Sequence, residues 1–119
     1  MEERTIQRLE EAGIHVPEVL ERFMGSEVLL VKFLKKFLED ENYEKLAQAM
    51  KGQDYGEALR ASHTLKGVCG NLSMGNLYEL TAKQVGLFRA EKYQEAEEMM
   101  PAISREYEKI CEALRRELA

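Results

Sequence analysis

The sequence has only 2 prolines and 2 cysteines among its 119 residues, and it has no excess of positive charge. Because proline is scarce and 45% of the residues are hydrophobic, the chain is expected to fold as one domain rather than to stay disordered. Val, Ile and Thr are sparse and no apolar residues alternate with polar ones, which argues against a sheet. The formal net charge of -5 argues against a nucleic-acid partner, since phosphate binding needs concentrated positive charge.

The two cysteines, Cys69 and Cys111, form no CxxC pair, and the acidic start Met1-Glu2-Glu3 does not resemble a secretory leader. We therefore expect reduced, buried thiols and a cytoplasmic location. No apolar run reaches the roughly 18 residues that a membrane span requires, so no membrane partner is expected.

The abundant residues, Glu, Leu, Lys, Ala and Met, are those that favour helices. Boundary signals divide the chain into two short N-terminal segments closed by Gly13 and Gly25, a helix capped by Ser26, a helix around residues 43–50, a helix from Tyr55 to about Leu72 capped by Asp54, a helix capped by Asn76, and a segment from Tyr93 to Leu118 that Pro101 kinks or restarts. Short loops make neighbouring helices antiparallel. The prediction is an all-α, up-down four-helix bundle (residues 26–119) with an additional N-terminal helical cap (residues 1–25).

The helix from Tyr55 to Leu72 has an unusual polar face. At about 100° per residue, Ala61, Leu65 and Leu72 project roughly opposite His63 and predict the core side. Three glycines project within about 40° of His63 instead, namely Gly56, Gly67 and Gly70. A glycine inside a helix costs roughly 0.8–1.0 kcal/mol relative to alanine. Close helix packing is the simplest reason for such glycines, but their position away from the core favours a clearing that exposes His63 to another protein.

An imidazole in a clearing is a candidate nucleophile, because histidine is the side chain that ordinarily titrates near neutral pH. Lys66 lies three residues further on the same side and can reach a group attached to the ring. A charged hydrogen bond to a phosphoryl group there is worth roughly 1.5–3 kcal/mol. Other site types fit less well. His15, His63, Cys69 and Cys111 lack zinc-ligand spacing, Ser62-His63 diverge on the helix, and Gly67-x-x-Gly70 lacks the strands of a nucleic-acid clamp.

The run from Ala61 to Leu72, ASHTLKGVCGNL, closely resembles the H-x-L-K-G signature of histidine-containing phosphotransfer (HPt) domains. Upstream, Gly13-Ile14, the segment from Leu20 to Gly25 and the apolar repeat through Phe37 look like the N-terminal part of bacterial family members. Where the family usually has glycine after the last leucine of the motif, this chain has Ser73, for which we expect a modified helix end.

The resemblance implies a phosphocarrier in a two-component phosphorelay, with no kinase or phosphatase activity of its own. His63 would be the phosphoacceptor and Lys66 its electrostatic partner. The expected partners are a response-regulator receiver domain, a hybrid histidine kinase, or both, docked on the His63 face through Leu59, Arg60, Gly67, Gly70 and Asn71 and on a neighbouring helix that the sequence does not identify. No cofactor or metal is expected in this chain, because the divalent cation of such transfers belongs to the acidic pocket of the receiver.

Two hypotheses follow from these observations. In the first, His63 accepts and donates a phosphoryl group. In the second, the same face binds a partner as a non-catalytic helical interaction module; a cofactor-binding bundle is a distant third, since no second ligand faces His63. The chain is expected to act as a monomer, and its starting Met1 favours a free-standing protein over a piece of a larger kinase.

Overall fold

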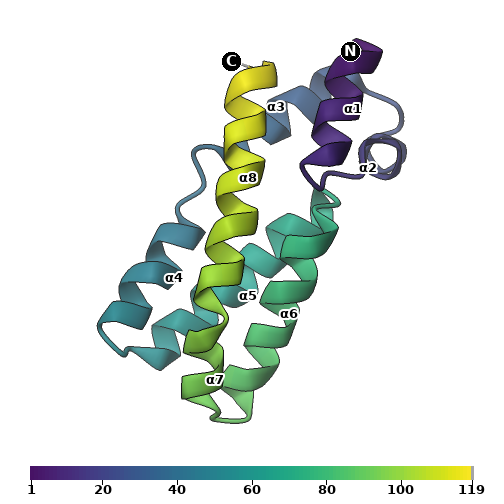
Figure 1. The fold of residues 1–119 in the computed structure, drawn as a ribbon. Coiled ribbons are helices and arrows are strands. Elements are labelled where there is room, and N and C mark those ends of the chain that lie inside the picture. The colour runs from purple at the N-terminus through teal and green to yellow at the C-terminus, as the bar shows by residue number, and fades with distance from the viewer. Residues whose placement is uncertain (119) are drawn as a thin grey trace.

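The computed structural model describes residues 1–118, and its regular elements are all α-helices (Figure 1). In chain order they are α1 (Glu3–Glu11), α2 (Val16–Arg22), α3 (Glu27–Phe37), α4 (Asn42–Lys51), α5 (Tyr55–Asn71), α6 (Gly75–Arg89), α7 (Tyr93–Glu98) and α8 (Met100–Leu118). An isolated antiparallel bridge between Ile14 and Met74 is the sole extended pairing within residues 1–118. The predicted all-α fold is confirmed.

The helices α4, α5, α6 and the α7–α8 pair form a bundle, in which α4 and α6 pack on α5 (Figure 1). Short links join α4 to α5 and α5 to α6, so consecutive helices run antiparallel. α8 continues beyond this bundle, and α1 and α3 pack against it there. Across residues 1–118, every helix is too short or too polar to span a lipid bilayer.

Most of the predicted helix ends are confirmed. The Ser26 hydroxyl accepts a hydrogen bond from the Leu29 amide at 3.2 Å, and Asp54 caps α5 in the same way. Gly13 adopts a φ of +104°, a left-handed conformation that glycine reaches without steric cost, as its place after α1 predicts. Pro101 is the second residue of α8, so the helix restarts there as predicted.

The predicted cap at Asn76 is wrong. The helix α6 begins earlier, at Gly75, and Met74 occupies its N-cap position without a side-chain hydrogen bond. The main chain here is held in another way, because Ile14 pairs with Met74 and the His15 amide donates to the Ser73 carbonyl at 3.0 Å. The segment between α1 and α2 therefore supports the turn between α5 and α6.

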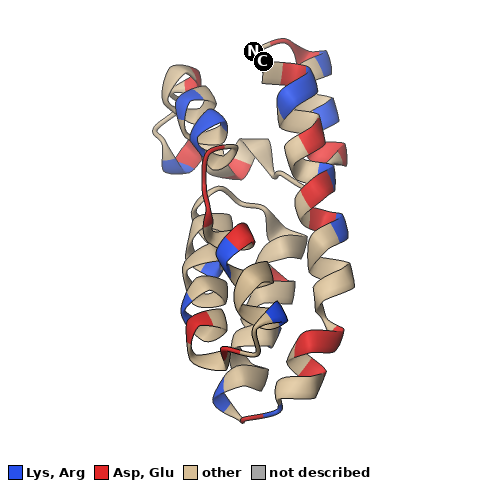
Figure 2. Ribbon diagram, turned by 90° about the vertical axis from the view of Figure 1, so that its left-hand side faces the viewer, with Lys and Arg blue, Asp and Glu red and all other residues tan. Residues whose placement is uncertain are grey.

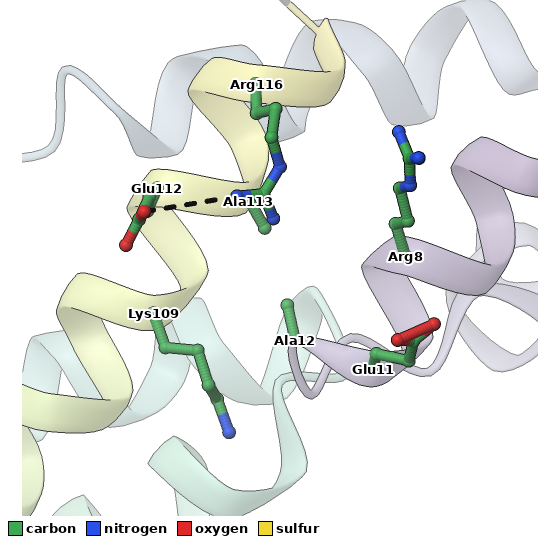
Figure 3. A pocket seen from close by; sticks show the side chains of 7 residues that line it. All are labelled: Arg8, Glu11, Ala12, Lys109, Glu112, Ala113 and Arg116. Carbon is green, nitrogen blue, oxygen red and sulfur yellow. Dashed lines mark ion pairs between the residues drawn. The ribbon is translucent and has the colours of Figure 1, made fainter.

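A pocket of about 460 Å³ lies between α1 and α8, and its lining includes Ala12, just after α1, and Ala113 of α8 (Figure 3). Arg8 donates a hydrogen bond to Glu117 at 3.2 Å across the two helices. Arg116 lies 3.9 Å from Glu112. The Arg8–Glu117 pair therefore joins α1 to α8, whereas the Arg116–Glu112 pair lies within α8. Figure 2 likewise shows charges of both signs along α8.

Candidate functional site

The helix α5 turns one side to the core and the other to solvent, as its projection predicts. Ala58 and Leu65 are fully buried and Ala61 is nearly so. His63 and Gly67 are exposed. The predicted placement of His63 opposite the core is therefore confirmed.

The imidazole of His63 is free of intramolecular partners. Within residues 1–118 its ring nitrogens make no hydrogen bond and no ion pair. A neutral imidazole keeps a lone pair on one ring nitrogen. Exposed in this way, that lone pair is available to an electrophile carried by another molecule.

The two cations near His63 differ in their partners. Arg60 donates two hydrogen bonds to the Glu57 carboxylate, at 2.6 and 3.1 Å, and this pairing raises the pKa of Arg60 further above its ordinary value. Lys66 is half-buried, and no carboxylate of the described chain lies within ion-pair distance of it. The positive charge available to a group on His63 is therefore that of Lys66, while the charge of Arg60 is partly neutralised.

Gly67 and Gly70, both predicted to leave open space around His63, have different surroundings. A Cβ on Gly67 would meet nothing within 4 Å, so the space beside His63 is open there. A Cβ on Gly70 would stand 3.1 Å from the Tyr78 ring of α6. The prediction of a clearing at Gly70 is wrong, because this glycine admits an aromatic ring from the neighbouring helix. Close packing, the simpler explanation, holds for Gly70 and not for Gly67.

The remaining predicted docking residues lie on two sides of this face. Leu59 is half-buried and packs against the core, so only part of its surface is open to a partner. Asn71 is exposed at the end of α5, and its carbonyl accepts a hydrogen bond from Arg22 of α2 at 2.7 Å.

The helix α3 lies beside the second half of α5. A groove of about 250 Å³ separates α3 from the second half of α5, with Phe33 and Lys36 on one side and Val68 and Asn71 on the other. The Lys36 ammonium lies 5.5 Å from the centre of the Phe33 ring. The groove is thus lined by apolar side chains together with one basic residue, Lys36, and one acidic residue, Asp40.

Large apolar side chains are exposed where α2 turns into α3. The exposed fractions are 94% for Met24, 82% for Val28 and 41% for Leu29. Phe23, next to Met24, stacks on Phe33 with ring centres 5.2 Å apart. The exposed apolar residues and the groove therefore lie side by side. We call Met24, Val28 and Leu29 the apolar tip.

Ser73 occupies a left-handed turn after α5, with a φ of +54°. Glycine adopts this left-handed conformation without steric cost, whereas serine does so at some cost. The serine side chain, which glycine lacks, modifies this end of α5 through its hydrogen bonds. The Ser73 hydroxyl accepts from Arg22 at 2.9 Å and donates to Glu18 at 2.9 Å. The serine thus ties the end of α5 to α2.

Sequence reasoning missed the role of Ser62 and Gln84, which are fully buried and hydrogen-bonded to each other at 2.8 Å. A signal was present, since Gln84 falls at helical spacing in the buried stripe of α6. That stripe consists of Leu77, Thr81, Gln84, Val85 and Phe88. Two polar residues at core positions indicate a buried polar contact.

The zinc alternative finds no support in the arrangement of its four residues. Cys69 and Cys111 are buried, whereas His15 and His63 are exposed. Burial raises the pKa of the Cys69 thiol to about 12 and also raises that of Cys111. Among residues 1–118 no three His, Cys, Asp or Glu side chains gather in a way that could hold a metal ion.

The sequence also matches a family model, described as Hpt domain, over residues 31–117. The chain belongs to the Hpt domain family. No curated protein and no solved structure matches the chain. Hpt domains are helical phosphocarriers of phosphorelays that work with receiver domains and histidine kinases. The matched range of this Hpt domain contains His63, Lys66 and the groove beside α3, whereas α1, α2 and all three residues of the apolar tip precede it.

Proposed function

We propose that this Hpt domain accepts a phosphoryl group on His63 from an aspartyl phosphate of a receiver domain and donates it to another. The observation that carries the proposal is an exposed imidazole, free of partners within residues 1–118, that lies opposite the core and beside the lysine of the family motif. The chain supplies a nucleophile and a docking surface, and no kinase or phosphatase activity of its own.

The chemistry needs little from this chain. The lone pair of the His63 imidazole attacks phosphorus, the P–O bond to the aspartate of the receiver breaks, and the electron pair leaves on that carboxylate. Such transfers depend on in-line positioning and on neutralising the phosphoryl oxygens. Lys66 supplies one positive charge on the His63 side. The divalent cation is a property of the receiver, whose acidic pocket would hold it.

The docking surface combines the face of α5 with α3. Gly67 leaves room for the receiver to approach the imidazole, and the groove between Phe33 and Val68 extends this surface to α3, whose first turn carries Val28 and Leu29 of the apolar tip. An apolar surface of this kind favours burial against another protein. Leu59 and Arg60 precede His63 along α5. Arg60 is available to a partner only if its ion pair with Glu57 breaks. A monomer is sufficient for this role.

The decisive experiment incubates the purified chain with a phosphorylated receiver, or with a hybrid kinase and ATP. The expected result is an acid-labile phosphoryl group on this chain, absent from a His63→Gln variant of unchanged helicity. His15→Gln is the matched control, because His15 is the other histidine and is also exposed. Label that persists in His63→Gln would contradict the assignment. Receiver binding without any label would indicate the interaction module instead.

A further inference from the structure

A buried chain of hydrogen bonds begins at Ser62, the residue before His63. The Ser62 hydroxyl of α5 donates to Oε1 of Gln84 on α6 at 2.8 Å. Nε2 of Gln84 donates to the Ala96 carbonyl of α7 at 3.0 Å and lies 3.3 Å from the Met100 sulfur of α8. Ser62 and Gln84 are both fully buried. We call Ser62 and Gln84 the polar pair.

The direction of these bonds is determined by their chemistry. The Ala96 carbonyl can only accept, so the amide nitrogen of Gln84 must face it. The amide oxygen of Gln84 must then face Ser62, whose hydroxyl has to donate. The polar pair therefore has one arrangement, and a rotation of α5 about its axis would leave a buried oxygen without a donor.

In the half of α5 that precedes His63, the fully enclosed positions carry little apolar bulk. The buried residues there, Ala58, Ala61 and Ser62, have small side chains, and the larger Tyr55 and Leu59 are only partly buried where they pack against the core. Small side chains interdigitate little with a neighbouring helix, so they resist rotation less than large ones do. A directional polar contact in a core can specify the rotation instead.

The rotation of α5 about its own axis determines where the His63 imidazole lies. His63 follows Ser62 and projects about 100° from it around the helix, so holding Ser62 inward aims the imidazole outward. An imidazole about 6 Å from the helix axis moves about 2 Å when the helix rotates by about 20°. A misplacement of about 1 Å can cost about a hundredfold in the rate of an oriented reaction.

We propose that Ser62 and Gln84 are positioning residues for phosphoryl transfer, which hold α5 at the rotation that presents His63 to its partner. This inference rests on the proposed function of His63. A positioning role differs from a purely structural role in one respect. Loss of the polar pair should slow phosphoryl transfer even in a variant whose free energy of unfolding equals that of the native chain.

The test compares Ser62→Ala, Gln84→Met and the double variant Ser62→Ala/Gln84→Met with the native chain. Each is measured for its free energy of unfolding and for transfer from a phosphorylated receiver, as the maximal rate constant and the receiver concentration that gives half of it. Thr81→Val is the matched control. Thr81 is an equally buried hydroxyl, but it bonds only to carbonyls of its own helix, those of Leu77 and Tyr78.

Ser62→Ala should lower stability and reduce the maximal rate constant about tenfold, with half-saturation changed by less than about twofold. In the double variant stability should recover, because both buried partners are replaced and the Ala96 carbonyl keeps its bond from the Met99 amide. Its transfer should stay about tenfold slow. Thr81→Val should lose stability and keep the native rate constant.

Native transfer in the double variant, or an equal loss of rate in Thr81→Val, would overturn the positioning role while leaving the proposed function intact. A native chain that takes no label, under conditions where a reference Hpt domain does, would instead overturn the proposed function.

Discussion

The Tyr78 ring of α6 lies against Gly70 of α5, with two ring carbons 3.1 Å from where a Cβ would stand. Gly67, one turn earlier, has open space in the same direction. Of these two glycines, one thus packs against a neighbouring helix and the other leaves open space beside His63.

This difference predicts opposite effects of alanine on stability. Gly67→Ala should raise the free energy of unfolding by about 0.8–1.0 kcal/mol through helix propensity, and should slow transfer because its methyl group faces the partner. Gly70→Ala should not raise the free energy of unfolding, because the added Cβ would displace the Tyr78 ring. Urea unfolding measures both. In a Tyr78→Ala background Gly70→Ala should become stabilising, and equal stabilisation by the two alanines in the native chain would refute the packing role of Gly70.

Lys66 and Arg60 should contribute unequally to phosphoryl transfer. Lys66→Ala should shift the equilibrium of phosphoryl groups from this chain toward the receiver by up to about tenfold, equivalent to about 1.4 kcal/mol, since a charged hydrogen bond is lost. Arg60→Ala should shift it less, because Glu57 already partners the guanidinium. Radiolabel partitioning at equilibrium measures the shift. A larger effect at Arg60 would show that its pairing with Glu57 breaks on docking.

The contact between Glu18 and Ser73 predicts an acid-dependent contribution to stability. The hydrogen bond from Ser73, followed by the hydrogen bond and the positive charge of Arg22, lowers the pKa of Glu18 below its ordinary value of 4.5. A lowered pKa means that this contribution is complete above about pH 4.5 and is lost as pH falls through the folded-state value. Ser73→Ala should therefore be destabilising at pH 7, and its difference from the native chain should shrink below pH 4.5. Thermal unfolding across pH 3–7 measures this, and a constant difference would contradict it.

The apolar tip should contribute to partner binding and not to folding. Met24→Asp and Val28→Asp should change the free energy of unfolding by less than about 0.5 kcal/mol, since both side chains are exposed. Each should weaken binding of a receiver severalfold, because a charge replaces apolar contact area. Titration calorimetry measures the affinity, with Gln7→Asp on the exposed surface of α1 as the control. Unchanged affinity in both tip variants would place docking elsewhere.

Sequence periodicity was sufficient to predict the all-α fold, most helix ends and the exposed side of His63. These features depend on local signals, such as the caps at Ser26 and Asp54 and the spacing of apolar residues along one helix. The start of α6 was not predictable in this way, because pairing of Ile14 with Met74, distant in sequence, replaces a side-chain cap.

The same limit applies to the site. A projection of residues around the axis of one helix shows that Gly67 and Gly70 point away from the core. It contains no information about α6, whose Tyr78 covers Gly70. It likewise could not identify α3 as the second wall of the groove. Contacts between helices require the tertiary arrangement, whereas faces of a single helix do not.

The burial of both cysteines makes this chain convenient for spectroscopic labelling. Cys69 and Cys111 are the two thiols of the sequence, and burial raises the pKa of each, so the thiolate that reacts with maleimides is scarce at neutral pH. A single cysteine introduced at exposed Thr64 or Asn76 would then carry a fluorophore or spin label without removal of the native thiols. Partner approach to the His63 face could be followed from such a probe in real time.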